Sequence, residues 1–235
     1  MAIEDNIIKI RERINKAALA CGRNPDEILL CAATKMNDAY AVKRAIKAGV
    51  DCCGENKVQE FLTKFKDNAY EDAPVHFIGH LQTNKVRSVV GKVDLIQSVD
   101  SLRLLEAINR EAEKQNIRQE ILLEINIANE PSKSGFSTTD ICDILPLIAN
   151  YKNIFVCGLM TIPPICENPG ENCKFFQEMY QLSVDITTKK GDNVCVDILS
   201  MGMSDDFTDA IGCGSTMIRI GTAIFGQRNY TKHQL

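Results

Sequence analysis

The sequence predicts an α/β protein built as a single (β/α)8 TIM barrel, with an extra helix at its N-terminus. Two observations carry this prediction. Eight short apolar runs rich in Val and Ile recur along the chain, each with a length that suits a buried parallel strand. Amphipathic stretches separate them, so a strand–helix unit repeats within 235 residues, near the lower size limit of such a barrel. A doubly wound open sheet is the alternative, and we expect residues 1–235 to form one domain.

A helix comes before the first strand. Its apolar residues recur at spacings of three and four and therefore share one face: Ile3, Ile7, Ile10, Ile14, Ala17 and Cys21. Gly22 and Pro25 end this helix. We expect it to cover an end or a side of the barrel.

The predicted strands are the apolar runs at residues 28–33, 50–53, 75–78, 94–99, 121–127, 154–160, 194–199 and 217–220. Three of the stretches between them have a clear helical pattern, at residues 39–46, 102–112 and 175–180. Asp100 or Ser101 is a suitable N-cap for the second of these helices.

Composition and charge exclude several classes of protein. Hydrophobic residues make up 45% and charged residues 25%, as in folded globular proteins. The net charge of −4 argues against a nucleic-acid or anionic-membrane surface. The ten cysteines form no C-x-x-C pair and suit a reducing compartment. The acidic N-terminus is no signal peptide, and no apolar run reaches the ~18 residues of a membrane span. We therefore expect a cytoplasmic protein.

Lys35 is the first candidate site residue. In a (β/α)8 barrel the chemistry lies at the carboxyl ends of the strands, and Lys35 follows the first predicted strand with no turn residue between them. Partial desolvation there would lower the pKa of the ammonium group and free a nucleophilic amine, which can form a Schiff base with a carbonyl. The alternative is an ordinary surface lysine.

The segments after strands seven and eight suggest a phosphate site. Ser200, Met201, Gly202 and Ser204 follow the seventh strand, and Gly221 and Thr222 follow the eighth. Small residues allow backbone N–H groups to approach an anion, and these two loops are the usual phosphate site of the barrel. Ordinary tight turns are the alternative interpretation.

Arg219 is predicted to point into the barrel, because side chains alternate along a strand and Ile218 and Ile220 would face the helices. A buried guanidinium needs a partner. That partner is either a ligand or a carboxylate, and Asp197 and Glu124 are the carboxylates that the barrel interior could supply.

The histidines do not form a helical metal pair, although His76 and His80 are four residues apart, because they lie at the end of a predicted strand. His80, after Gly79, is the better pocket candidate. No third clustered ligand is visible along the chain, so we expect no metal site.

Several segments resemble one known family. They are Gly54–Glu60 (GENKVQE), His76–Lys85 (HFIGHLQTNK), Ser132–Gly135 (SKSG), Gly158–Met160 (GLM), Leu199–Asp206 (LSMGMSDD) and Gly214–Gly226 (GSTMIRIGTAIFG). Together they are similar to the pyridoxal phosphate homeostasis protein family, which is related to the N-terminal domain of alanine racemases. The resemblance runs from about Leu29 to Gly226.

The resemblance implies a site for pyridoxal 5′-phosphate (PLP). It implies that Lys35 carries the cofactor as an internal aldimine, and that Ser200, the backbone of Met201 and Gly202, Gly221 and Thr222 hold its phosphate. It places Arg219 at the pyridine nitrogen and Asn56 and His80 along the pocket. The family usually has a Pro soon after the lysine, whereas Met, Asn and Asp follow here.

The resemblance also implies a function in PLP homeostasis without fast amino-acid turnover. A cation at the pyridine nitrogen disfavours its protonation and weakens the ring as an electron sink. Racemisation also needs a second base, and the sequence ends too soon after the last strand for the β-domain that supplies one in alanine racemases. A PLP-dependent racemase of low activity and a class I aldolase are the alternatives.

The expected partners are PLP and, as recipients, PLP-dependent apoenzymes, with no nucleic acid and no membrane. We expect a monomer. Lys133 is either a solvated loop lysine or a second cation at the pocket mouth.

Overall fold

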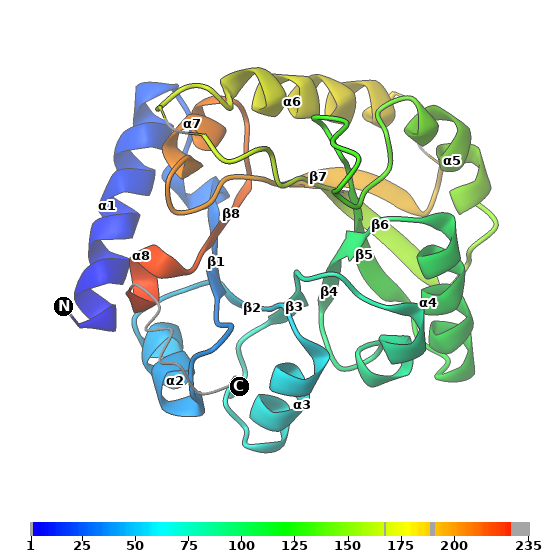
Figure 1. Ribbon diagram of the computed structural model, residues 1–235, viewed down its shortest axis with the longest axis horizontal. Coiled ribbons are helices and arrows are strands. Elements are labelled where there is room, and N and C mark those ends of the chain that lie inside the picture. Colours follow the sequence, from blue (N-terminus) through cyan, green and yellow to red (C-terminus); the bar gives the residue numbers. More distant parts are fainter. Residues whose placement is uncertain (1, 167, 189–190, 227–235) are drawn as a thin grey trace.

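The closed barrel is the central feature of the computed structural model, which describes residues 2–166, 168–188 and 191–226. Eight parallel strands follow one another around the barrel in chain order, and β8 pairs with β1 to close it (Figure 1). This confirms the predicted barrel and excludes the open sheet. Residue 1 and residues 227–235 of the predicted domain lie outside the described residues.

The predicted strands agree with the observed ones, with end shifts of a few residues. The strands are β1 (Leu29–Ala33), β2 (Cys52–Glu55), β3 (Val75–Phe77), β4 (Leu95–Val99), β5 (Gln119–Glu124), β6 (Ile154–Met160), β7 (Val194–Ser200) and β8 (Met217–Ile220). The largest shift is in β5, where the apolar run continues past the strand. Ile125 there leaves the barrel ladder and pairs with Phe136 in an isolated bridge.

The helices lie outside the ring of strands (Figure 1). They are α1 (Ile3–Ala20), α2 (Ala39–Lys47), α3 (Val58–Lys66), α4 (Leu102–Lys114), α5 (Asp140–Ile148), α6 (Cys173–Thr187), α7 (Phe207–Gly212) and α8 (Thr222–Phe225). Two 3-10 helices, η1 (Pro25–Glu27) and η2 (Thr83–Ser88), complete the set. The connection from β3 to β4 thus contains η2 where the other strand connections contain an α-helix.

Hydrogen-bonding side chains begin two of the predicted helices. Ser101 is the N-cap of α4 and accepts a hydrogen bond from the Leu104 N–H, as one of the two predicted caps. Asp38 caps α2 in the same way, through the Ala41 N–H at 2.8 Å. None of the helices in the described ranges combines the length and the apolar character needed to cross a membrane.

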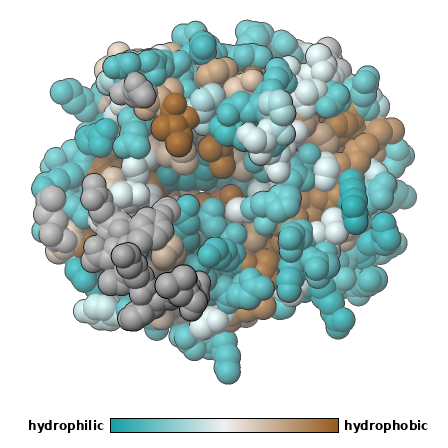
Figure 2. All heavy atoms as spheres, viewed as in Figure 1, coloured by the Kyte–Doolittle hydropathy of each residue, from teal (hydrophilic) through white to brown (hydrophobic). Residues whose placement is uncertain are grey.

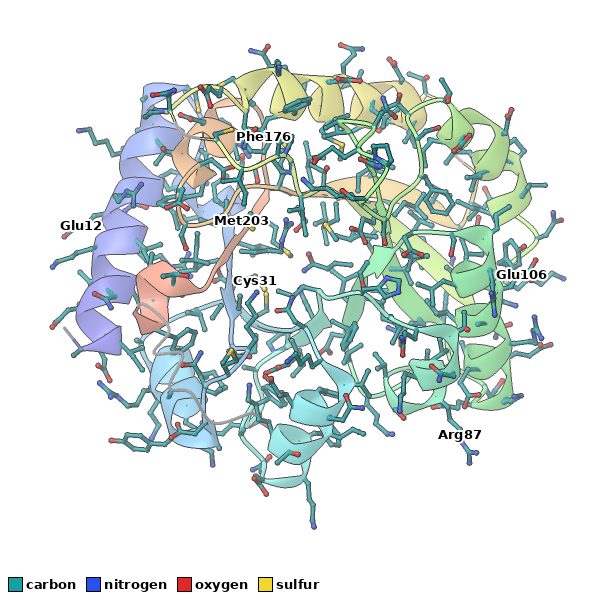
Figure 3. All side chains as sticks on the ribbon, in the orientation of Figure 1. Glu12, Cys31, Arg87, Glu106, Phe176 and Met203 are labelled. Atoms are coloured by element: carbon teal, nitrogen blue, oxygen red, sulfur yellow. The ribbon has the colours of Figure 1, made fainter. Side chains whose placement is uncertain are left out.

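The hydrophobic core has an inner and an outer part. Inside the barrel, small and medium side chains such as Cys31, Ala33, Cys157 and Met160 fill the space between the strands. The larger outer part lies between the strands and the surrounding helices, where Phe176 of α6 turns inward (Figure 3). Because both faces of the sheet are buried, the strands read as continuous apolar runs.

Helix α1 covers the side of the barrel where it closes. Its buried residues Ile7, Ile10 and Ile14 pack with residues of β1, β8, α7 and α8. At its end the buried position is Ala18, whereas the predicted Cys21 is exposed because the helix has already ended at Ala20. This helix therefore reinforces the junction of the first and last strands.

We predict that Ile14→Ala lowers the free energy of unfolding by about 2–5 kcal/mol, because it leaves a cavity under α1. Ile14 is 1% exposed. Ile8→Ala, six residues away on the same helix but 56% exposed, is the matched control and should change the value by less than about 0.5 kcal/mol. Urea denaturation measures both, and equal effects would contradict the packing of α1.

Candidate functional site

Lys35 lies in a turn directly after β1. The strand alternation that turns Cys31 and Ala33 into the barrel places Lys35 on the same side, and its side chain is half-buried. The Asn37 N–H donates to the Thr34 carbonyl at 3.2 Å, which closes a turn around Lys35 and Met36. This turn fixes where the lysine leaves the strand.

Met36 has a φ of 62°, an unusual value for a residue with a side chain. Its N–H donates to Glu60 Oε2 at 2.8 Å, and the Asn37 side chain donates to the Lys35 carbonyl at 3.0 Å. These bonds hold the turn between β1 and α2 in place.

A buried ion pair lies behind this turn, between β2 and α3. Glu55 Oε1 accepts hydrogen bonds from Lys64 Nζ at 2.7 Å, Thr34 Oγ1 at 2.5 Å and Tyr70 OH at 3.1 Å. Lys64 Nζ also donates to the Thr34 carbonyl at 2.7 Å. Burial and the Glu55 charge raise the pKa of the Tyr70 hydroxyl, so that it remains a donor. The network ties the end of β1 to β2 and α3.

Arg219 points into the barrel, as predicted, and is 4% exposed. Its Nη1 donates to Ser200 Oγ at 2.6 Å and its Nη2 to the Thr161 carbonyl at 2.8 Å. Both partners are neutral, and in the described part of the chain no carboxylate forms an ion pair with Arg219. Asp197 is exposed and accepts a hydrogen bond from Cys195 instead. Burial lowers the pKa of the Arg219 guanidinium, but an arginine remains charged.

The loops after β7 and β8 meet beside Arg219. The Arg219 N–H donates to the Gly202 carbonyl at 3.0 Å, and the Ala223 N–H donates to Ser204 Oγ at 3.4 Å. Within the described ranges, five backbone N–H groups of these loops have no acceptor, namely those of Gly202, Ser204, Asp205, Gly221 and Thr222. Unpaired amides gathered in this way form a site for an anion.

The glycines of these two loops differ in how much room their surroundings leave. Gly202 has a φ of 95°, and a Cβ there would lie 2.6 Å from the Ala210 Cβ, so a side chain does not fit. At Gly221 a Cβ would lie 3.4 Å from the Ala33 Cβ. The loop after β8 therefore runs close to the end of β1, two residues before Lys35.

Two of the predicted phosphate ligands already have partners within the barrel. The Met201 N–H donates to the Met217 carbonyl at 3.1 Å, and the Met201 side chain is buried. The Ser200 hydroxyl accepts from Arg219 and donates to Gln97 Oε1 at 2.7 Å. In this structure Ser200 therefore orients Arg219. The phosphate-binding roles of Ser200 and Met201 stay predictions.

Asn56 and His80 differ in their surroundings. Asn56 Oδ1 is buried and accepts no hydrogen bond in the described structure. Gly79 lies against Asn56 so closely that a Cβ at Gly79 would be 2.2 Å from the Asn56 carbonyl oxygen.

The His80 side chain is 60% exposed, and its Nδ1 lies 3.2 Å from Asp100 Oδ2. His80, Asp100 and Arg103 line a cavity of about 580 Å³. Asn56 Oδ1 can therefore accept a hydrogen bond from a bound group, whereas His80 lies at the exposed rim of the cavity.

Gln97, in the middle of β4, is a site residue that sequence reasoning missed. It is fully buried, and its side chain links Ser200 Oγ to His76 Nδ1, the latter at 2.9 Å. A polar residue inside an apolar strand was the only signal available. The partners of Gln97 come from β3, β7 and β8, the last through Met217 Sδ at 3.1 Å, so its role depends on how the barrel closes.

Cys31 and Cys52 lie beside His76, the histidine that is hydrogen-bonded to Gln97. Cys52 Sγ is 3.4 Å from His76 Nδ1. A hydrogen bond from the Cys52 thiol, and then His76 and Arg219, lower the pKa of the Cys31 thiol, and the pKa of Cys52 rises correspondingly. The sequence analysis found no third clustered ligand beside the histidines because these residues come from three strands.

Glu124, at the end of β5, was considered only as a partner of Arg219. Burial raises its pKa to about 7, and the nearby Asp100 carboxylate adds to this effect. Arg219 and His80 oppose it through their positive charge. Glu124 is thus a carboxyl group of the site that changes its charge near neutral pH.

Lys133 lies in the loop after β5. Its Nζ is 2.6 Å from Glu130 Oε1 and 3.4 Å from the Ile162 carbonyl. The side chain is 31% exposed. In this structure Lys133 thus forms a partly exposed ion pair.

Three comparisons relate the chain to known proteins. The family described as "Alanine racemase, N-terminal domain" matches residues 2–229. A pyridoxal phosphate homeostasis protein of Aquifex aeolicus is 38% identical over 226 residues, 96% of this chain and 98% of its own. PipY of Synechococcus elongatus PCC7942, solved with PLP bound, is 31% identical with a TM-score of 0.79, over 92% of this chain and all of that one.

An alanine racemase of Clostridium difficile shares the fold. It is 15% identical with a TM-score of 0.73, and the match covers 97% of this chain and 58% of the racemase. Both solved structures support the assignment of a (β/α)8 barrel.

We predict that Lys64→Met lowers the free energy of unfolding by about 3–5 kcal/mol, because it leaves the Glu55 carboxylate buried without its cation. Adding Glu55→Gln to this variant should recover part of the loss. Lys66→Met, exposed on the same helix, is the control. Urea denaturation gives the values, and a loss below about 1 kcal/mol would mean that the pair is not buried in solution.

We predict that Glu124→Gln stabilises the protein at pH 8. The folded-state pKa of Glu124, about 7, lies above its unfolded value, so wild-type stability falls as pH rises from about 4.5 to 7. The variant should be more stable by about 1–3 kcal/mol at pH 8 and equal at pH 4. Glu120→Gln, exposed on the same strand, is the control. An advantage that is the same at both pH values would contradict this assignment.

Proposed function

The chain belongs to the pyridoxal phosphate homeostasis proteins within the alanine racemase N-terminal domain family, and we propose that it binds PLP through Lys35 and serves in the homeostasis of this cofactor. The PLP-bound structure of its relative PipY supports the choice of cofactor. The proposed unit is the single barrel together with α1.

The observation that carries the proposal is the meeting of three chemical groups at one end of the barrel. Lys35 offers an amine for an aldehyde, Arg219 offers a buried cation with neutral partners, and the loops after β7 and β8 offer unpaired amides for a phosphate. PLP carries an aldehyde, a ring nitrogen and a phosphate. The buried, unpartnered Asn56 Oδ1 fits a bound group as well. These residues therefore fit the cofactor.

Arg219 supports the second half of the proposal, the absence of fast turnover. When bound, PLP supplies an aldehyde that condenses with amines and a ring that withdraws electrons. Arg219 is a donor only and does not give up its proton, so it would leave the ring nitrogen of bound PLP unprotonated, as an acceptor. A ring in that state withdraws electrons weakly, which disfavours proton loss at an amino-acid Cα. Lys35 is the one base that we assign to the reacting carbon.

The proposal includes a cellular setting. All ten cysteines lie within the described ranges, and the nine whose side chains are described are free thiols, which supports a reducing compartment such as the cytoplasm. We propose that the chain acts as a monomer and that PLP-dependent apoenzymes receive the cofactor from it.

We predict that Lys35→Ala abolishes the covalent attachment of PLP. Wild-type protein mixed with PLP should gain the visible absorbance of a Schiff base, and borohydride reduction followed by mass spectrometry should locate the label on Lys35. Lys57→Ala, whose side chain is 69% exposed nearby, should behave as wild type. A label of full strength on another lysine in Lys35→Ala would contradict the proposal.

The same preparation separates the two alternatives from the proposed function. A racemase would change the optical rotation of L-alanine or another amino acid at ordinary rates of ~1–1000 per second. A class I aldolase would trap a sugar phosphate on Lys35 and show no Schiff-base absorbance with PLP. Either result would replace the homeostasis function.

A further inference from the structure

Three side chains inside the barrel have no part in the proposed cofactor site. Cys31 of β1, Cys52 of β2 and His76 of β3 turn inward, with exposures of 0%, 2% and 7%. Both Sγ atoms and a ring nitrogen of His76 lie within 4.8 Å of one another. Neither thiol forms a disulfide. Figure 3 shows Cys31 within the ring of strands, whereas Glu12, Arg87 and Glu106 point away from it.

A row of hydrogen bonds runs from Arg219 through Ser200 and Gln97 to His76. This row determines which nitrogen of His76 carries a proton. A guanidinium only donates, so Ser200 Oγ accepts from Arg219 and gives its own proton to Gln97 Oε1. The NH2 group of Gln97 must then face His76, and Nδ1 accepts its hydrogen bond at 2.9 Å. Nδ1 therefore keeps its lone pair, and Cys52 Sγ lies 3.4 Å from it. An unprotonated imidazole nitrogen is the form that binds a metal. A metal ion at Nδ1 takes the place of the Gln97 hydrogen bond, and Gln97 Nε2 keeps Met217 Sδ as a partner at 3.1 Å.

We propose that Cys31, Cys52 and His76 bind one soft, thiophilic metal ion. Metal–sulfur bonds of about 2.3 Å and metal–nitrogen bonds of about 2.0–2.1 Å separate the two ligand atoms by about 3.6 Å at a tetrahedral angle and by about 3.8 Å at a trigonal one. The observed separation of Cys52 Sγ and His76 Nδ1 is 3.4 Å. Two thiolates and an imidazole select Cu⁺ or Zn²⁺ over the harder Mg²⁺ and Ca²⁺. Three side chains that only filled space inside the barrel would not need a hydrogen bond that orients the His76 ring.

The charge near the cluster favours Cu⁺. Arg219 is the neighbour of Cys31 across the β1–β8 pairing and brings one positive charge. Two thiolates, this guanidinium and a monovalent ion sum to zero, whereas a divalent ion leaves a net charge in a buried space, which is costly. Three ligand atoms also suffice for a trigonal Cu⁺ site. Binding involves no electron transfer, and each protonated thiol releases its proton to solvent.

The test measures Cu⁺ retention by the full chain against a chromophoric Cu⁺ chelator, without oxygen, before and after loading with PLP. Wild type should retain one Cu⁺ ion more than each of the variants Cys31→Ser, Cys52→Ser and His76→Phe. In each variant the affinity of this site for Cu⁺ should fall at least about tenfold. Cys53→Ser is the matched control. Cys53 is equally buried and next in the chain, but it faces α3 with Phe61 and Phe77.

A second measurement needs no variant. X-ray absorption of wild-type protein with one equivalent of Cu⁺ should reveal two sulfur neighbours at about 2.3 Å and one nitrogen at about 2.0 Å. Loss of the ion to the chelator, all-sulfur ligation, or equal retention in the three variants would overturn the proposal. Zn²⁺ is titrated in parallel, and tighter binding of Zn²⁺ than Cu⁺ at the cluster would overturn the assignment to Cu⁺. Because the retention measured before PLP is added and the X-ray absorption both need no bound PLP, the proposed function can fail independently.

Discussion

The hydrogen-bonded pairing of β8 with β1 is the constraint on which the functional arrangement depends. It makes Arg219 the neighbour of Cys31 and brings Gly221 against Ala33, although each pair is separated by most of the chain. The amine that follows β1 and the amides that follow β7 and β8 therefore face the same end of the barrel. Helix α1 packs across this junction, so the N-terminal segment stabilises the closure on which the site relies.

The protein accommodates two buried cations in opposite ways. Lys64 has a full counter-charge in Glu55, outside the strands, and the pair braces the turn that carries Lys35. Arg219, inside the strands, has a hydroxyl and a carbonyl as its side-chain partners among the residues that the structure describes. The first arrangement fixes a backbone segment, because breaking it would leave a charge in an apolar space. The second leaves a positive field at the barrel mouth, which suits an anionic ligand. Hydrophilic side chains cover much of the barrel end in Figure 2, and apolar groups surface near its centre.

A continuous row of hydrogen bonds joins the two sites that we propose. It runs from Arg219 through Ser200 and Gln97 to His76, and each member sets the donor or acceptor role of the next. The guanidinium at one end thereby defines the tautomer of the imidazole at the other. Two ligands that engage the ends of such a row are thermodynamically linked, so each affects the affinity of the other by the same factor.

The sequence by itself determined the architecture and the inward direction of Arg219. Apolar runs buried on both faces and separated by amphipathic stretches specify parallel strands between helices. The alternation of β8 sends Arg219 inward, and Lys35 is recognisable because it directly follows a strand. These features are local, since a few neighbouring residues carry each of them.

Only the tertiary structure decided which distant groups meet. The Glu55–Lys64 pair, the position of Gln97 and the cluster of Cys31, Cys52 and His76 all depend on the register between different strands. For the same reason Asp197, a reasonable partner of Arg219 in the sequence, instead lies exposed. Strand register and barrel closure arise from the packing of the whole chain, and no short segment encodes them.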